Sequence, residues 1–524
     1  MSDLGDVLVS RSDIARLAGV KRPAVTNWER RHPDFPMPVA PDAGSTGSEA
    51  FRAGEILEWL SGRTIPSNAL QPGESAGTTY GDRFRVGLGG ERPGSLLSAV
   101  EQLAWRDADR LRGRLRMSDY VYLLLFLVFA QSQEKERWSD YVADAEAGPV
   151  DLDVPVEYDR LSLSHAVRFL DRNPPASRDE SRQAFDRLLA LLRDTDARTA
   201  DEFFTPPSVS RVMARALAAQ APPAKRLHDP FCRSGELLAG YLDAVAEQGG
   251  TAPEEVSGRG AYEGTLRLAR MNLQLRGVHR PRIRPGPLIP SHGPTDPPES
   301  FDAVIANPPF AVRVDNGVSP PEYWRYGVTR QGDFDWLQYV VSRLAPGGRA
   351  AVLMPAGAGF RSGAVGQARA RMVEDGVVEC VMALPQQLFA LTAIRTQIWF
   401  LRPPRGHAES VLFVDGAALG SMTSRTRRTL SGDDVDRLVQ SYVSWRNEGH
   451  GRTPGLSRAV APEEIADRDH QLEPALYVRD PQGDLPQASA KNRLAELSDE
   501  LEKLYEQATT IDRLVEVRLR RYGL

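Results

Sequence analysis

The segment FDAVIANPPF, residues 301–310, constrains the fold of this chain most strongly. It begins as an apolar, partly β-branched run and ends in an amide, two prolines and an aromatic ring. Proline donates no backbone N–H, so a strand that begins at Phe301 must end at about Asn307. Further apolar runs alternate with helical patterns from about residue 201 onwards. This alternation predicts an α/β fold with a doubly wound parallel sheet.

A chain of 524 residues is too long for a single hydrophobic core, so we expect about two to four domains. A Pro-, Gly- and Ser-rich stretch indicates a linker after the N-terminal domain, and a region of helical periodicity follows it. The last segment spaces leucines three or four residues apart, as in a long amphipathic helix. The predicted segments are 1–62 (N-terminal domain), 63–95 (linker), 96–200 (all-α domain), 201–480 (α/β domain) and 491–524 (C-terminal helix).

The N-terminal domain has the pattern of a helix-turn-helix. Ser10 suits the N-cap of a first helix, Gly19 suits the turn, and Pro23 suits the start of a second helix. A short wing and a third helix should follow. Arginines on the second helix could reach DNA phosphates or guanine edges. The alternative is a protein-docking domain whose arginines are merely solvated. The candidate DNA-binding residues are Arg22, Thr26, Asn27, Arg30 and Arg31.

Bulk properties limit the class of protein. The formal net charge is −5, so any nucleic-acid surface must be local. Cys232 and Cys380 are the only cysteines, which fits a reducing cytosol and argues against a disulfide or a four-ligand zinc site. The apolar run 121–130 is too short to span a bilayer, and the N-terminus lacks a signal-peptide pattern. We expect a soluble, cytoplasmic protein with no membrane contact and no bound metal.

Residues 307–310 suit chemistry at the exocyclic amino group of a nucleobase. The side-chain oxygen of Asn307 and the carbonyl of Pro308 could accept the two amino protons, which favours a pyramidal nitrogen that attacks an electrophilic methyl group. Pro308 and Pro309 would keep this loop rigid, as preorganised stabilisation requires. Phe310 offers a flat face on which a base flipped out of the duplex can stack. The alternative is an ordinary turn after a strand, with Phe310 in the core.

A second strand end is predicted at DPFCRSG, residues 229–235, where Asp229, small residues and a glycine precede a helix. In an open α/β sheet, ligands bind beyond the carboxyl ends of the strands. Two such ends together could hold a cofactor and a substrate.

These two motifs occur in order with FFTPPSVSRVMARAL, RLARMNLQLRG and APGGRAAVLMPAGAGFRSG. The set resembles the modification subunit of type I restriction systems, within the γ-class N6-adenine DNA methyltransferases, over about residues 100–480. The resemblance implies a Rossmann-like class I methyltransferase domain after an all-α domain. It implies site-specific transfer of a methyl group from S-adenosylmethionine to adenine N6, in restriction-modification or phage defence. The implied partners are double-stranded DNA and a sequence-specificity subunit, and the resemblance also allows a nuclease subunit.

The resemblance also implies roles for particular residues. Those that would hold the target adenine are Asn307, Pro308, Pro309 and Phe310. Those that would bind the cofactor are Phe204, Thr205 and Pro206 at its methionine end, Asp229, Pro230, Ser234 and Gly235 in the loop around it, and Glu263 at the ribose.

This chain departs from the family pattern at three positions of the cofactor pocket. Arg233 stands where the family has a glycine, and it could pair with the cofactor carboxylate. Gly260 and Pro287 stand where the family has acids, although Glu263 could substitute for the first. These departures motivate an alternative function, that of a catalytically impaired, methylase-like protein with a DNA-binding and regulatory role. Methylation of RNA or of protein glutamine is a third possibility that fits the helix-turn-helix less well.

Overall fold

The computed structural model describes fourteen stretches of the chain, and they fall into two compact units, Met1–Phe204 with Tyr262–Pro281, and Thr205–Ala261 with Arg282–Leu524. Each unit is described by itself. No helix of the described residues is long and apolar enough to cross a membrane. The described residues are 8–39, 50–66, 69, 78–87, 95–111, 116–148, 156, 158–195, 205–286, 300–310, 324–329, 332–389, 394–424 and 427–479.

The N-terminal part of the first unit has short helices at both predicted positions. Ser10 is the N-cap of the first, where its hydroxyl accepts from the backbone N–H of Asp13 in a capping box. Gly19 has a φ of 65° between the two helices, a conformation that glycine adopts without strain. A two-stranded antiparallel sheet and a third helix complete this part. The elements are β1 (Leu8–Ser10), α1 (Arg11–Leu17), α2 (Arg22–Arg31), β2 (Ala50–Arg52) and α3 (Ala53–Ser61).

A fourth helix, α4 (Tyr80–Gly87), lies within the segment for which composition predicted a linker. Phe84 is fully buried in the core that α1, α2 and α3 share, and the ring of Tyr80 meets Trp28 edge-on at 5.2 Å. This helix therefore adds to the N-terminal core. Its apolar residues are few, and the Gly- and Pro-rich flanks dominate the local composition, which is why periodicity did not reveal it.

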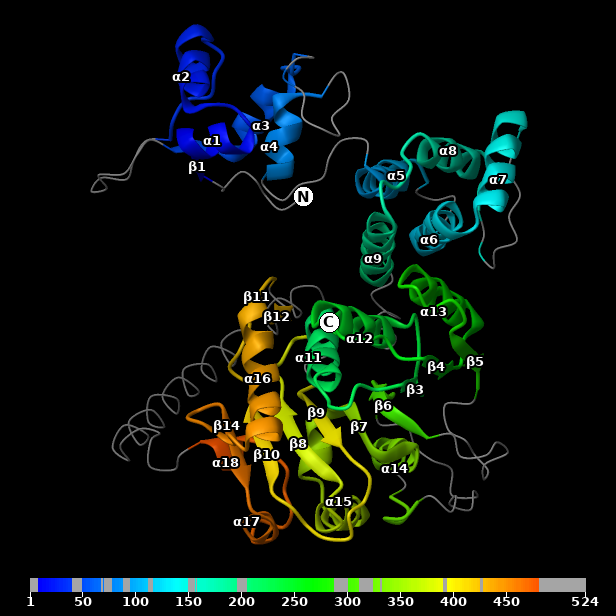
Figure 1. Ribbon diagram of the computed structural model, residues 1–524, viewed down its shortest axis with the longest axis vertical. Helices are drawn as coiled ribbons and strands as arrows, with labels where there is room; N and C mark the ends of the chain where they lie inside the picture. Colours follow the sequence, from blue (N-terminus) through cyan, green and yellow to red (C-terminus); the bar gives the residue numbers. More distant parts are fainter. Residues whose placement is uncertain are drawn as a thin grey trace, which may run out of the picture. The chain divides into compact units, whose positions relative to one another are not determined.

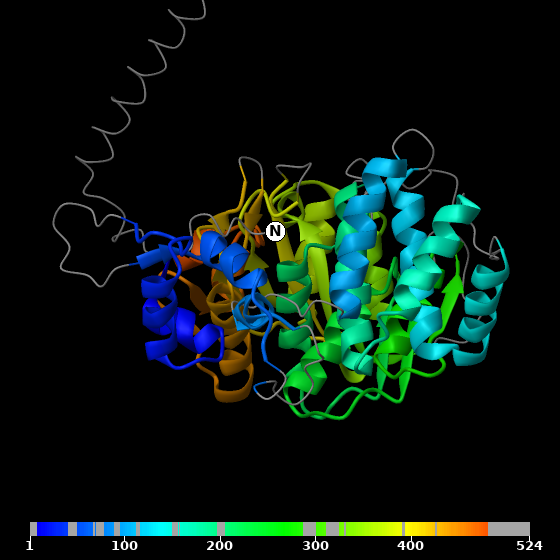
Figure 2. The same cartoon turned by 90° about the horizontal axis from the view of Figure 1, so that it is seen from above.

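The rest of the first unit is the predicted helical region together with one helix from the α/β part of the sequence. Helix α6 is buried almost all round from Tyr120 to Gln131, so the apolar run is a core helix. Leu268, Met271 and Leu275 of α13 pack into the same core. Figure 2 shows α5 to α9 side by side in light blue and cyan. The helices are α5 (Leu96–Leu111), α6 (Met117–Gln133), α7 (Lys135–Ala147), α8 (Arg160–Asp171), α9 (Arg178–Thr195) and α13 (Glu263–Leu275).

The second unit is built on a ten-stranded sheet with the order β13-β14-β10-β8-β9-β7-β6-β3-β4-β5 (Figure 1). Several of its strands are buried along their whole length, as expected for strands covered on both faces. The strands are β3 (Arg226–Asp229), β4 (Glu255–Gly260), β5 (Arg282–Pro285), β6 (Phe301–Ala306), β7 (Leu344–Pro355), β8 (Val378–Ala383), β9 (Thr396–Leu401), β10 (Val411–Asp415), β13 (Arg452–Thr453) and β14 (Ser457–Val460).

The sheet is mixed, whereas the alternation of elements predicted a parallel one. Strands β5, β4, β3, β6 and β7 are parallel, but β9 runs antiparallel between β7 and β8. No helix separates β8 from β9 among the described residues, so the chain returns directly and the second strand must run in the opposite direction. At the same end of the sheet, β14 also runs antiparallel to β10, and β13 runs antiparallel to β14. The α/β class is as predicted, and the directions of these strands differ from the prediction.

Helices cover the sheet on its two faces. Phe334, Leu337 and Val365, from α14 and α15, belong to one core with the strand residues Val304 and Val352. Helix α11 packs against both α12 and α16 over the sheet (Figure 1). The predicted C-terminal helix, 491–524, lies outside the described residues. The remaining elements are α11 (Pro207–Ala218), α12 (Glu236–Glu247), α14 (Gly332–Ser342), η2 (Ala356–Gly359), α15 (Ala364–Glu374), β11 (Ser421–Met422), β12 (Arg428–Thr429), α16 (Gly432–Glu448), α17 (Pro462–Ala466) and α18 (Ala475–Val478).

The strand order reverses between β3 and β6. From β3 the chain proceeds outward to β4 and β5, and from β6 it proceeds the other way to β7. Leu227 and His228 of β3 pair directly with Ala303 and Val304 of β6. Loops that leave two strands in opposite directions open a crevice at their carboxyl ends, which is where α/β sheets bind ligands. The two predicted motifs follow these two strands.

Candidate active site

Asn307 follows the last residue of β6 and is buried, with 5% of its surface exposed. Its side-chain Nδ2 donates a hydrogen bond of 3.0 Å to the hydroxyl of Thr205. Because the amide nitrogen is held in this way, the amide oxygen Oδ1 faces away from Thr205. The structure thus brings together two residues 102 positions apart in the sequence.

The rest of the Asn-Pro-Pro-Phe motif forms a supported turn. Pro308 is buried, and Pro309 and Phe310 are partly exposed. The indole of Trp336 in α14 donates to the carbonyl of Pro309 at 3.0 Å, and its ring packs edge-on against Phe231 with the ring centroids 4.8 Å apart. The apolar surroundings of Trp336 in the sequence predict an ordinary core residue. It is 99% buried, and it also anchors the loop that follows β6.

Thr205 and Pro206 begin the second unit just before α11. Thr205 is 1% exposed, and its backbone N–H donates to a carboxylate oxygen of Glu236 at 3.2 Å. Pro206 is the N-cap of α11 and has an extended ψ of 136°, so the chain turns sharply between Thr205 and the helix. Phe204, predicted with these two residues, lies outside the described residues.

The loop 229–235 joins β3 to α12 and is mostly buried. Gly235, the last residue of this loop, has a left-handed φ of 75° and is the N-cap of α12. Arg233, by contrast, does not have a positive φ. The loop therefore requires glycine at position 235, and the arginine at position 233 does not strain the backbone. Pro230 and Ser234, predicted as cofactor residues, are buried in this loop, and their contact with a cofactor stays a prediction.

Asp229 ends β3 and is 98% buried. Burial raises the pKa of its carboxyl group to about 8, and the charge of Glu236 contributes to the increase. One carboxyl oxygen accepts the backbone N–H of Phe231 at 2.9 Å. Asp229 is therefore protonated at neutral pH in the absence of a ligand, and it offers both an acceptor and an O–H donor.

Cys232 is buried and packs against β4. A Cβ atom added to Gly258 would lie 2.7 Å from the Cβ of Cys232 and 2.9 Å from its sulfur, so glycine is required for this close approach. Burial raises the pKa of the Cys232 thiol well above its usual value, so the thiol stays neutral and is a poor nucleophile. Its role is to pack the loop onto the sheet.

Glu236 is the site residue that the sequence did not suggest. It is the first residue of α12, and each of its carboxylate oxygens has a different partner: the hydroxyl of Ser234 at 2.9 Å and the backbone N–H of Thr205 at 3.2 Å. An acid at this position suggests only a favourable interaction with the helix dipole. Its contact with Thr205 connects elements 31 residues apart and depends on the tertiary fold.

The remaining positions considered for the cofactor pocket are Gly260, Glu263 and Pro287. Gly260 is the buried last residue of β4 in the second unit, and Pro287 lies outside the described residues. Glu263 begins α13, which belongs to the first unit, and its carboxylate pairs with Arg270. A role for Glu263 at the ribose stays a prediction.

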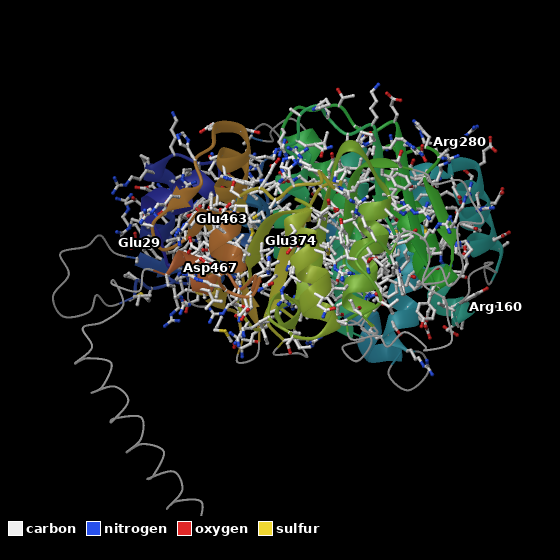
Figure 3. All side chains as sticks on the ribbon, turned by 90° about the horizontal axis from the view of Figure 1, so that it is seen from below. Glu29, Arg160, Arg280, Glu374, Glu463 and Asp467 are labelled. Atoms are coloured by element: carbon white, nitrogen blue, oxygen red, sulfur yellow. The ribbon has the colours of Figure 1, made fainter. Side chains whose placement is uncertain are left out.

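The predicted DNA-binding residues of α2 all have exposed side chains. The acid on this helix, Glu29 (labelled in Figure 3), is held by Arg11 through two hydrogen bonds of 2.8 and 2.7 Å. Within the described part of the chain neither Arg30 nor Arg31 makes an ion pair, so both guanidinium groups are available to a phosphate. DNA binding by this helix stays a prediction.

His228, which has no other histidine near it in the sequence, has a structural environment and not a metal-binding one. It is buried, stacks on Phe301 with the centroids 4.2 Å apart, and bonds Ser257 at 2.9 Å. Burial lowers the pKa of His228 to about 3, so the ring is neutral. Across the described ranges, no three His, Cys, Asp or Glu side chains are grouped so that they could hold a metal ion.

Comparison with solved structures identifies the class of fold. The type I restriction-modification methyltransferase subunit from Streptococcus thermophilus has a TM-score of 0.60 and 18% identity, over 73% of this chain and 100% of that chain. The modification subunit of a putative type I restriction enzyme from Vibrio vulnificus YJ016 has a TM-score of 0.55 and 18% identity, over 72% of this chain and 94% of that chain. The fold is the α/β methyltransferase fold with an all-α region.

Sequence comparison identifies the family. The methylase subunit of type I restriction enzyme HindI, from Haemophilus influenzae, is 27% identical over 304 residues, which are 56% of this chain and 67% of that protein. The MjaIX methylase subunit from Methanocaldococcus jannaschii is 24% identical over 311 residues, 56% of this chain and 54% of that protein. The N-6 DNA Methylase family matches residues 176–484, more than half of the chain. The chain belongs to this family of adenine-specific DNA methyltransferases.

Proposed function

We propose that this chain is the modification subunit of a restriction-modification system and transfers a methyl group from S-adenosylmethionine to adenine N6 at a specific DNA site. The main support is the position of Asn307. Its amide is buried and oriented at the carboxyl end of β6, beside the β3 loop at the point where the strand order reverses. Family membership supports the same reaction.

In this proposal Asn307 and Pro308 hold the adenine amino group. Asn307 Oδ1 faces away from Thr205 and accepts one N6 proton, while the Pro308 carbonyl accepts the other. Two acceptors localise the nitrogen lone pair, which otherwise delocalises into the ring. The Trp336 hydrogen bond to Pro309 keeps the acceptors in place before the base arrives, so little reorganisation is needed. Phe310 stacks on the flipped base, which contributes about 1–3 kcal/mol.

The residues of the β3 loop fit S-adenosylmethionine. When bound, this cofactor supplies a methyl group on a positively charged sulfur and leaves as a neutral thioether. Gly235 turns the loop without a side chain, and Asp229 presents a buried carboxyl group that can donate and accept. The guanidinium of Arg233 carries the charge that matches the carboxylate at the amino-acid end of the cofactor. With the cofactor bound, its methyl group would pass to N6 as the carbon–sulfur bond breaks, and the proton that N6 loses would go to water, while Asn307 and Pro308 would hold the amino group in place.

Two measurements test this function with the full chain. Calorimetric titration with S-adenosylmethionine should give a Kd near micromolar, about −8 kcal/mol. Mass spectrometry should find N6-methyladenine in the DNA of cells that carry the wild-type protein and lack other adenine methylases. Cofactor binding without methylated adenine would refute the catalytic step. No detectable heat of cofactor binding, together with no methylated adenine, would refute the enzyme and favour the methylase-like regulatory protein.

We further propose that α2 contacts double-stranded DNA. Arg30 and Arg31 are exposed and make no ion pair with another described residue, and the nearby acid Glu29 is occupied by Arg11. Replacing Arg30 and Arg31 together with alanine should weaken DNA binding and reduce the slope of log K against log salt by roughly 2, because each removes about one phosphate contact. The control is Arg16→Ala on α1, also exposed. An unchanged salt slope would favour protein docking.

The same proposal includes partner subunits. A structurally related protein, with a TM-score of 0.58, comes from a type I restriction-modification system that undergoes complex assembly and a conformational transition. A subunit that reads DNA sequence should therefore copurify with this chain, and the same preparation tests for a nuclease subunit. Copurification from cells that express the neighbouring genes tests this directly. A chain that methylates its site alone would refute the need for a specificity subunit.

A further inference from the structure

Glu236 connects two segments of the site that are distant in sequence. One carboxylate oxygen accepts the hydroxyl of Ser234 at 2.9 Å, and the other accepts the backbone N–H of Thr205 at 3.2 Å. Ser234 belongs to the loop 229–235, and Thr205 is the residue that holds the amide of Asn307. A continuous chain of hydrogen bonds therefore runs from the cofactor loop to the residue proposed to hold the base.

Three of the four residues in this series of hydrogen bonds are buried, and the fourth, Glu236, is partly exposed. Ser234 is fully buried, Thr205 is 1% exposed and Asn307 is 5% exposed. Gly235, between Ser234 and Glu236, fixes the entry to α12 through its left-handed conformation. Hydrogen bonds to a carboxylate are about twice as strong as neutral ones, and in a buried setting a shift of one member is transmitted to the next.

We propose that Glu236 is a positioning residue that couples cofactor binding to base binding. This inference rests on the proposed function. A ligand that settles into the loop 229–235 orders Ser234 and Glu236, and Glu236 in turn holds the backbone of Thr205. Thr205 then holds the Asn307 amide with its oxygen toward the adenine. Binding of cofactor and of DNA is consequently cooperative, and the cooperativity is reciprocal.

A purely structural role for Glu236 leads to a different expectation. An acid in the first turn of a helix stabilises it by interaction with the helix dipole, and its loss would lower stability alone. Coupling is a separate quantity, because it compares DNA affinity with and without the cofactor in the same variant. It is therefore the measurement that distinguishes positioning from simple stabilisation.

The experiment measures DNA affinity by fluorescence anisotropy, with and without saturating sinefungin, a cofactor analogue that cannot transfer a methyl group. The protein is the full chain with any subunits that copurify, and the labelled duplex carries the site found methylated in cells. For the wild type, sinefungin should tighten DNA binding about 5- to 50-fold. Glu236→Gln keeps the shape of the side chain but replaces one acceptor oxygen by a donor nitrogen. Sinefungin should therefore increase the DNA affinity of this variant by less than about 2-fold.

Two further variants keep the test valid if Glu236→Gln folds poorly. Thr205→Val removes the hydroxyl that accepts from Asn307 and should also abolish the coupling, whereas Thr205→Ser keeps the hydroxyl and should retain it. The matched control is Glu247→Gln, the same substitution at the exposed far end of α12, which should behave as the wild type. The double variant Glu236→Gln/Thr205→Val should be no worse than either single variant, because the residues act in series.

The outcomes separate the inference from the proposed function. If the wild type binds sinefungin and methylates DNA but shows less than about 2-fold coupling, or if Glu236→Gln and Thr205→Val keep the wild-type coupling, the role of Glu236 is refuted and the enzyme stands. If the wild type binds no cofactor analogue and forms no methyladenine, the proposed function itself fails.

Discussion

Replacement of Asn307 by alanine is the most informative single perturbation, because its effects on stability and on activity should differ greatly in size. The side chain donates a neutral hydrogen bond of 3.0 Å to Thr205. Its loss leaves the buried Thr205 hydroxyl without that donor, at a cost of about 1–3 kcal/mol. For a unit of this size, each kcal/mol lowers Tm by roughly 2–4 °C, so the protein should stay folded at about 25 °C.

The effect on catalysis should be much larger. Asn307→Ala removes one of two acceptors placed where the amino group must be held, and removing one preorganised group of this kind typically lowers kcat by about 100- to 1,000-fold. Transfer of a labelled methyl group into DNA with saturating cofactor measures this change. Calorimetry on the same sample should give nearly unchanged cofactor affinity, since the cofactor loop is intact.

The control variant is Asn173→Ala in the helical region. Asn173 is partly buried, and its side chain also donates one hydrogen bond, of 2.8 Å, to the carbonyl of Phe169. It should lose a similar amount of stability and keep its activity. If Asn307→Ala retains methyl transfer within about threefold of the wild type, the assignment of Asn307 to the amino group is wrong.

Three further predictions concern the β3 loop and its surroundings. Because burial raises the pKa of Asp229 to about 8, the folded protein keeps a proton that the unfolded chain loses near pH 4, so stability falls as pH rises from about 4 through 8, and Asp229→Asn should flatten Tm against pH over this range. Gly235→Ala forces a left-handed φ on alanine and should cost about 1–2 kcal/mol in denaturant titration. In Gly258→Ala the added methyl group overlaps Cys232, which should lower the free energy of unfolding by about 1–3 kcal/mol. The control Gly264→Ala, whose methyl group meets nothing within 4 Å, should stabilise α13 by roughly 0.5–1 kcal/mol. Equal effects at the two glycines would contradict the close approach of Gly258 to Cys232.

Much of the fold followed from local pattern. The alternation of elements predicted the α/β class, the apolar run 121–130 predicted a buried helix, and Ser10 and Gly19 marked the ends of α1. These predictions succeed because side-chain periodicity, caps and turn residues act over a few residues. They fail where a distant partner decides: α4 gains its place from the N-terminal core, and α13, although it lies within the α/β part of the sequence, packs with the helices of the first unit.

The site divides in the same way. The motif residues Asn307 and Asp229 were recognisable, because their chemistry and their place at strand ends are properties of short segments. The sequence by itself determined that an acceptor-rich, rigid turn follows a buried strand and that a glycine-ended loop follows another. Only the tertiary structure placed these strands side by side, turned the Asn307 amide by way of Thr205, and made Glu236 the residue between them. The physical reason is that hydrogen bonds and burial depend on neighbours in space, and residues 31 or 102 positions apart become neighbours only when the sheet forms.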